Sequence, residues 1–258
     1  MKPIVLITAG DPLGIGPEVT VKSLKNPLVQ RVCFPVVIGE PTSLVRAGFS
    51  DKLARLIAID SSVPLPDKPV PSFAGGETSF KAVELGIKLA LKTKTPLVTA
   101  PINKQSWSLY GVPYTGHTEL LREYAGKEGL MMFISGDLRC GLVTEHLLTQ
   151  ERIVAAGVHF NRALKKLGIQ NPHIAVCALN PHASDNGKFG TEENEVISPA
   201  VKALHRHKIK ADGPLPADAL WLAHAAGQYD GLLCMYHDQA LLGLKLAAKN
   251  RLSTSQPG

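Results

Sequence analysis

Short apolar runs alternate along the chain with segments in which apolar residues recur every three or four positions. This alternation is typical of buried parallel strands that are connected by helices packed on the sheet. Six runs are predicted to be strands, all short enough to be buried on both faces. They are Pro3 to Thr8, Phe34 to Ile38, Pro96 to Thr99, Gly141 to Thr144, His173 to Leu179 and Gly231 to Met235.

Three segments between these runs have helical spacing. The first, Glu77 to Lys92, carries an apolar stripe that should face the sheet: Phe80, Val83, Ile87 and Leu91. The second can be capped by Thr149 and ended by Gly168. The third begins near Thr191, where three acidic residues suit the positive end of a helix: Glu192, Glu193 and Glu195. Its inner face should carry Ile197, Val201 and Leu204.

Size and composition fit an α/β fold. The chain has 258 residues, of which 45% are hydrophobic, enough for one large domain or two lobes that share a cleft. Apolar stretches are shorter than a membrane span, and the first residues lack a signal-peptide pattern. Four cysteines without CxxC spacing indicate buried, reduced thiols. We therefore expect a cytoplasmic protein.

The chain is basic, with a formal net charge of +6. Lysine and arginine are spread along the sequence rather than gathered in one stripe, which argues against a nucleic-acid-binding protein. A solvated basic surface explains the charge. Part of the excess could instead attract an anionic, phosphorylated substrate, and the sequence leaves both explanations open.

Three of the predicted strands run into histidine. The fourth, fifth and sixth strands are followed by His146, His182 and His237. In open α/β sheets, ligands bind beyond the carboxyl ends of the strands. A single histidine there is usually only a polar residue leaving the core. If the three strands are neighbours, however, three imidazoles with an open coordination position predict a divalent-metal site.

Another histidine, His117, lies where a loop opens an amphipathic helix. Such a start offers unpaired backbone donors to an anion, or alternatively Thr118 simply caps the helix. The segment from Gly10 to Glu18 lacks the third glycine of a dinucleotide fingerprint, and Pro17 suits the first turn of a helix. Structural or surface roles are expected for the remaining histidines, His159, His173, His205, His207 and His224.

At these residues the chain resembles the 4-hydroxythreonine-4-phosphate dehydrogenase family of pyridoxal phosphate (vitamin B6) biosynthesis. The motifs that carry the resemblance are more specific together than singly. They are Gly-Asp-Pro-Leu-Gly-Ile-Gly-Pro-Glu at 10–18, Thr-Ala-Pro-Ile-Asn-Lys at 99–104, Tyr-Thr-Gly-His-Thr-Glu at 114–119, Asn-Pro-His at 180–182, Gly-Pro-Leu-Pro-Ala-Asp at 213–218 and Met-Tyr-His-Asp-Gln at 235–239.

The resemblance implies a two-lobed α/β/α fold similar to isocitrate and isopropylmalate dehydrogenases, with a mostly parallel sheet. It also implies NAD or NADP bound outside the Rossmann scheme, and a homodimer with active sites at the subunit interface. We expect a first lobe over residues 1–110 and a second lobe with dimer contacts over 111–215. Residues 216–258 would return toward the first lobe.

The family reaction oxidises 4-phosphooxy-L-threonine with NAD to a 3-oxo acid, which loses carbon dioxide to give 3-amino-2-oxopropyl phosphate. By resemblance, His146, His182 and His237 would bind one divalent cation, either Zn, Co, Mn or Mg. Such a cation can lower the pKa of the substrate alcohol and stabilise the enolate formed on decarboxylation.

The resemblance also implies substrate contacts by His117, Thr118 and Lys245. Lys245 could bind phosphate or relay a proton. Asp218 and Asp238 lie where acids could orient the imidazoles.

The resemblance ends near Lys245, where family chains continue with a glycine-rich segment bearing an asparagine and an arginine that contact substrate. Residues 246–258 show no strand pattern. We therefore expect a chain that is truncated or frameshifted at its C-terminus and has little or no dehydrogenase activity.

Four other functions stay open. Two lie within the family: a dehydrogenase of D-threonate or D-erythronate 4-phosphate, and a dihydrodiol dehydrogenase of aromatic degradation. A phosphate acyltransferase-like enzyme shares the fold at a distance but needs no histidine triad. The last alternative is a non-catalytic remnant that still binds metal or a partner.

Overall fold

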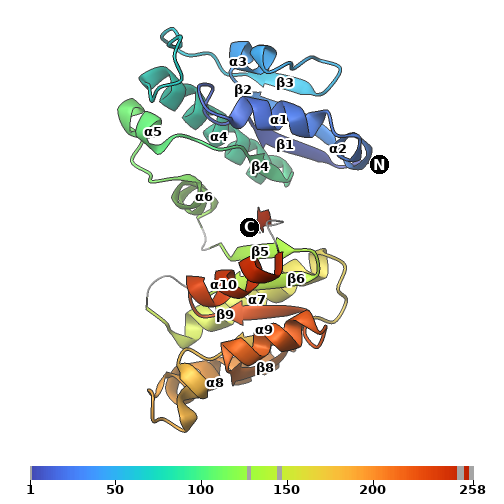
Figure 1. The fold of residues 1–258 in the computed structure, drawn as a ribbon, viewed down its shortest axis with the longest axis vertical. Coiled ribbons are helices and arrows are strands. Elements are labelled where there is room, and N and C mark those ends of the chain that lie inside the picture. The colour runs from blue at the N-terminus through green and yellow to red at the C-terminus, as the bar shows by residue number, and fades with distance from the viewer. Residues whose placement is uncertain (1, 127–128, 144–146, 249–252, 256–258) are drawn as a thin grey trace. The chain divides into compact units, whose positions relative to one another are not determined.

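The chain folds into two compact units, Met1–Glu128 and Gly129–Gly258, which are described separately. The computed structural model describes residues 2–126, 129–143, 147–248 and 253–255 (Figure 1). The division between the units does not coincide with the expected boundaries at 110 and 215. Helix α6 (His117–Ala125) packs on α4 (Phe73–Thr93) in the first unit, and the elements that follow residue 215 pack in the second.

The first unit contains a parallel four-stranded sheet in the order β3-β2-β1-β4. Its strands are β1 (Ile4–Thr8), β2 (Phe34–Gly39), β3 (Arg55–Ala58) and β4 (Leu97–Thr99). Three of them confirm the predicted strands. The carboxyl ends of β1 and β4 lie side by side, because Thr8 pairs with Thr99 in the register of the two strands.

Helices surround this sheet. They are α1 (Gly16–Leu24), α2 (Pro27–Val32), α3 (Pro41–Arg46), α4, α5 (Lys104–Tyr110) and α6. The prediction for α4 is confirmed at Val83 and Ile87, which are buried, but it is wrong at Leu91, which is 51% exposed. With 21 residues at about 1.5 Å each, α4 is longer than strands of three to six residues at about 3.3 Å each. The sheet is therefore too short to cover the whole apolar stripe of this helix.

The second unit contains a six-stranded sheet in the order β10-β5-β6-β9-β7-β8. The strands are β5 (Met131–Ser135), β6 (Leu138–Leu142), β7 (His173–Cys177), β8 (Lys210–Leu215), β9 (Gly231–Cys234) and β10 (Ser253–Ser255). The four strands β6, β9, β7 and β8 are parallel to one another. Strand β5 is antiparallel to β6, and β10 is antiparallel to β5. The expectation that the last residues form no strand is wrong, because β10 pairs with β5.

Helices cover both faces of this second sheet. They are α7 (Gln150–Lys166), the short 3-10 turn η1 (Pro181–Asp185), the π-helical turn η2 (Glu193–Ile197), α8 (Ser198–Arg206), α9 (Ala217–Ala225) and α10 (His237–Ala248). As predicted, Thr149 caps α7: its hydroxyl accepts a hydrogen bond from the Arg152 backbone N–H at 3.3 Å. Gly168, just after α7, adopts a positive φ, which suits a helix end.

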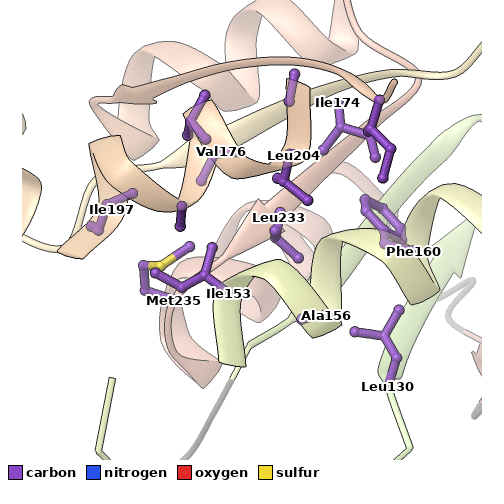
Figure 2. Packing of buried hydrophobic residues seen from close by; sticks show 14 of the residues in the cluster. Leu130, Ile153, Ala156, Phe160, Ile174, Val176, Ile197, Leu204, Leu233 and Met235 are labelled. Carbon is purple, nitrogen blue, oxygen red and sulfur yellow. The ribbon is translucent and has the colours of Figure 1, made fainter. Parts of the chain in front are cut away.

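Alternate residues of β7 enter two separate cores. Ile174 and Val176 join the core formed with α7 and α8, where Phe160 is fully buried (Figure 2). Ala175 and Cys177 join the core formed with α9 and α10. This alternation, which follows from the two-residue repeat of a strand, gives the unit three α/β/α layers and confirms the predicted fold class.

All four cysteines are buried and free, as predicted. Within the described ranges, no helix has both the length and the apolar character needed to cross a membrane.

Candidate functional site

The predicted metal ligands follow three adjacent strands of the second unit. Strand β9 pairs in parallel with β6 on one side and with β7 on the other, so their carboxyl ends meet at one edge of the sheet. His237 begins α10 directly after β9, and His182 lies in η1 after β7. His146, which follows β6 in the sequence, lies outside the described residues. The condition that the three strands be neighbours is thus met.

His237 is held by its sequence neighbour. Its Nδ1 lies 2.9 Å from the Asp238 carboxylate oxygen, and the imidazole is half-exposed. A carboxylate on Nδ1 favours the tautomer that leaves Nε2 unprotonated and available as a metal ligand. The contact is therefore of the kind expected for an acid that orients a metal-binding histidine.

His182 lies in an unusual stretch of backbone. Five consecutive residues from His182 to Asn186 have positive φ values between 43° and 65°. The left-handed region costs about 1–2 kcal/mol per residue that carries a Cβ, so this turn needs support from its surroundings. Inside the turn, the buried Ser184 hydroxyl accepts a hydrogen bond from the Gly187 N–H at 2.9 Å.

The segment that leads into this turn is fixed by Glu193. Its buried carboxylate accepts hydrogen bonds from the backbone N–H groups of Leu179 at 2.9 Å and Asn180 at 2.8 Å. Sequence reasoning treated Glu193 only as a charge that suits a helix start, because its contacts span 14 residues of chain. On the other side, the Gln239 side chain donates to the Ala178 carbonyl. The position of Gln239 in the Met-Tyr-His-Asp-Gln motif was the one signal that could have found it.

The other predicted residues of this unit are exposed. Asp218 lies in the first turn of α9, and Lys245 lies on α10. Within the part of the chain that the structure describes, neither makes a hydrogen bond or ion pair with His182 or His237.

His117 is the first residue of α6 in the first unit. Its ring packs edge-on against the buried indole of Trp107, with 5.7 Å between ring centroids. Among the described residues, its Nε2 is buried without a hydrogen-bond partner. Burial lowers the pKa of His117, so the ring is neutral at pH 7.

The start of α6 is not capped in the expected way. Its N-cap is Gly116, which offers no side-chain acceptor, and Thr118 lies inside the first turn. The alternative that Thr118 caps the helix is therefore wrong. Glu119 instead accepts hydrogen bonds from the Thr115 backbone N–H and hydroxyl, both at 2.6 Å. The Lys104 side chain lies close to Gly116: its Cε is 3.8 Å from the position that a Cβ on this glycine would occupy.

Comparison with protein families gives one match over most of the chain. Residues 36–253 match the family described as pyridoxal phosphate biosynthetic protein PdxA. The match continues past Lys245, where the sequence-based resemblance was expected to end.

Individual relatives agree with this match. The 4-hydroxythreonine-4-phosphate dehydrogenase of Geobacter metallireducens is 37% identical, over 95% of this chain and 81% of its own length. A protein of Cutibacterium acnes that is provisionally named D-threonate 4-phosphate dehydrogenase is 35% identical, over 94% of this chain and 79% of its own length.

A solved structure extends the agreement to the fold. The crystal structure of 4-hydroxythreonine-4-phosphate dehydrogenase from Klebsiella pneumoniae superposes with a TM-score of 0.85 at 29% identity, covering all of this chain and 90% of the other. The family match, the relatives and the order of the histidine-bearing strands lead to one conclusion. This chain belongs to the PdxA family of dehydrogenases.

Proposed function

We propose that this protein is a dehydrogenase that depends on NAD or NADP and on a divalent metal, and that acts on 4-phosphooxy-L-threonine in vitamin B6 biosynthesis. The observation that carries the proposal is the common sheet edge of His182 and His237, with Asp238 bonded to the His237 ring. The names of the relatives supply the reaction class.

Two described histidines after neighbouring strands support the proposal of a metal ion. Imidazole nitrogens are ligands for Zn, Co and Mn. Because Asp238 contacts Nδ1 of His237, the Nε2 atom is available to a metal. In our proposal His182, His237 and His146 hold one cation, which when bound acts as a Lewis acid on the substrate alcohol and on the carbonyl formed from it. The open position of the site would take the substrate.

The first unit would supply contacts to the substrate. His117 is neutral because its ring is buried, so it can accept or donate a hydrogen bond without adding a charge. The α6 start has no side-chain cap at Gly116, and its backbone donors, with Lys104 close by, suit an anionic group. We propose that His117, Thr118 and Lys245 contact the substrate, with Lys245 binding phosphate or relaying a proton.

A bound NAD or NADP would accept the hydride from the carbon that carries the substrate hydroxyl. The assembly we propose is a homodimer with active sites at the subunit interface. Light scattering at micromolar concentration should give twice the mass of one chain, and a monomer would contradict this part of the proposal. Free, buried cysteines support a reducing, cytoplasmic location.

The second candidate substrate is D-threonate 4-phosphate. The 35% identity with the Cutibacterium acnes relative favours it almost as much as the 37% identity with the Geobacter relative favours the first. The two compounds share a phosphate and a secondary alcohol, and they differ in the amino group of 4-phosphooxy-L-threonine.

The experiment that separates them measures the dissociation constant of each compound by calorimetry, which does not require turnover by this chain. We expect tighter binding of 4-phosphooxy-L-threonine. Tighter binding of D-threonate 4-phosphate would replace the first substrate by the second.

A further inference from the structure

Three consecutive residues connect β7 to the turn that carries His182, and side chains from elsewhere hold their backbone. The Ala178 carbonyl accepts a hydrogen bond from Gln239 Nε2 at 2.6 Å. The next two backbone N–H groups, of Leu179 and Asn180, both donate to Glu193 Oε1. The connection is thus fixed through its main chain, whatever side chains it carries.

Gln239 joins the ends of two strands. While its Nε2 donates to Ala178, its Oε1 accepts a hydrogen bond from the Met235 N–H at 2.9 Å, just after β9. Its own carbonyl accepts from the Trp221 indole at 2.7 Å. Because Gln239 lies two residues after His237, the same side chain links the segment that carries His237 to the segment that leads to His182.

Glu193 holds the other side of the connection. Burial raises the pKa of its carboxyl, but the hydrogen bonds from Asn180 and Leu179 outweigh this, and the pKa lies below its ordinary value. Its Oε2 also accepts from the Asn180 side-chain amide at 3.0 Å, and that amide donates to Glu192 as well. A buried, ionised carboxylate with several donors is among the strongest hydrogen-bond acceptors that a protein can place.

The left-handed turn that follows residues 178–180 explains why their backbone has to be fixed. Five residues with positive φ starting at His182 are unfavourable on their own and persist only where the surroundings fix them. A metal site also needs its imidazoles held within about half an ångström of the right geometry. Fixing residues 178–180 supplies the rigid base from which both requirements can be met.

We propose that Gln239 and Glu193 are positioning residues that together set the spacing and direction of His182 and His237 for a divalent cation. This inference rests on the proposed metal site. In this proposal neither residue contacts the cation or the substrate, and both act through the backbone that leads to the histidines.

The test measures Co²⁺ binding by calorimetry and the visible absorption spectrum of the bound Co²⁺. We compare the unmodified protein with Glu193→Gln, Gln239→Glu and His182→Ala. In Glu193→Gln an amide donor would face the Asn180 amide, and in Gln239→Glu a carboxylate would face the Ala178 carbonyl. Each should weaken Co²⁺ binding by about 10–100-fold and change the spectrum, as loss of support behind a ligand typically does.

Two matched controls carry the same chemical change at exposed positions. Glu195→Gln alters an acid in η2, and Gln228→Glu alters an exposed glutamine after α9. Both should bind Co²⁺ like the unmodified protein. If Glu193→Gln does not fold, Gln239→Glu and the milder Asn180→Ala carry the test.

The outcomes separate this inference from the proposed function. Equal Co²⁺ binding by the unmodified protein and His182→Ala would refute the metal site itself. A different result would overturn the positioning role alone. In that case His182→Ala would lose Co²⁺ binding, while the folded Glu193 and Gln239 variants would bind Co²⁺ with the affinity and spectrum of the unmodified protein.

Discussion

At the scale of single residues, the role of each histidine depends on its surroundings. His224 is buried, and its two ring nitrogens bond to the Arg139 N–H and the Tyr229 carbonyl, which is the structural role expected from the sequence. His237 is half-exposed, and its Nδ1 lies 2.9 Å from the Asp238 carboxylate. Both ring nitrogens of His224 are thus used within the unit, whereas an acid orients Nδ1 of His237 and leaves Nε2 for a ligand.

Replacing Asp238 by asparagine should weaken metal binding without unfolding the protein. The carboxylate on Nδ1 fixes the orientation and the tautomer of the His237 ring, and a neutral amide does both less well. We expect the dissociation constant for Co²⁺ to rise by about tenfold or more, measured by calorimetry. Asp137→Asn, at a fully exposed acid of the same unit, is the control and should leave it unchanged. Equal affinities in the two variants would contradict the role of Asp238.

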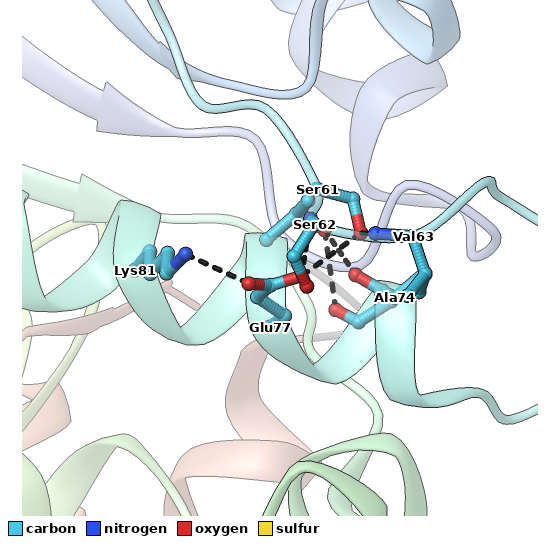
Figure 3. Close-up of polar contacts among 8 residues, drawn as sticks. Ser61, Ser62, Val63, Ala74, Glu77 and Lys81 are labelled. Carbon is cyan, nitrogen blue, oxygen red and sulfur yellow. Dashed lines mark hydrogen bonds and ion pairs between the residues drawn. The ribbon is translucent and has the colours of Figure 1, made fainter.

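Glu77 is a second buried acid, and its contribution is to stability (Figure 3). Its carboxylate accepts hydrogen bonds from Ser61, Ser62 and Lys81, which join the loop after β3 to α4. Burial raises the pKa of Glu77, but these hydrogen bonds outweigh it and lower the pKa to about 2. Glu77→Gln should therefore reduce the free energy of unfolding at pH 7 by about 1–3 kcal/mol, measured with urea.

The sign of the pH dependence follows from the lowered pKa of Glu77. The stabilisation is complete above the ordinary carboxyl pKa of 4.5 and is lost as the pH falls toward the folded-state value of about 2. The difference in free energy of unfolding between the unmodified protein and Glu77→Gln should therefore become smaller as the pH is lowered from about 5 to about 2. This range spans the two pKa values. Glu18→Gln, which breaks an exposed pair with Lys22, should have no measurable effect at either pH. A difference that grows on acidification would contradict this account.

At the scale of helices and strands, the close approach of α7 to the sheet depends on small residues. A Cβ on Gly231 of β9 would stand 2.5 Å from Cζ of Phe160, a rigid ring in the buried core. Gly231→Ala should lower the free energy of unfolding by about 1–3 kcal/mol through overpacking. Gly129→Ala, where a Cβ would meet no described atom within 4 Å, is the control for the change in backbone freedom. Equal thermal and urea stabilities of the two variants would show that the core adapts freely.

Strands with continuous apolar runs were predictable, even β4 at a sheet edge, whereas the edge strands β3, β8 and β10 and the inner strand β5 were missed. The buried strands β1, β7 and β9 are continuous apolar runs, so the sequence located them. Edge strand β8 contains Gly213 and Pro214, residues that normally interrupt strands, and β3 has no buried residue. Periodicity reports burial, and an edge strand that is only partly buried carries little of that signal.

Sequence patterns singled out the candidate residues of the site, which stay a prediction, but gave no sign of the contacts that fix their backbone. His182, His237 and His117 follow or precede regular elements, so local patterns singled them out. Glu193 and Gln239 act across long stretches of chain on a backbone of unusual conformation, and the left-handed run from His182 has no glycine before Gly187 to announce it. Contacts of that kind become visible only once the strand order is known.

At the scale of the whole molecule, the two units carry different parts of the proposed chemistry. The second unit holds the histidines that follow β7 and β9, and the first holds His117 at the start of α6. The family explains why both parts occur in one chain. The account as a whole depends on whether the second unit binds a metal ion through its histidines.

Metal content tests that claim most directly, because it does not depend on turnover. The purified protein and its His146→Ala, His182→Ala and His237→Ala variants are loaded with Co²⁺ or Zn²⁺, freed of excess metal and analysed for elemental content per chain. The account predicts one divalent ion per subunit in the unmodified protein and a clear loss in each variant, since removing one of three imidazoles leaves an incomplete site. The same metal content in all four proteins would contradict it.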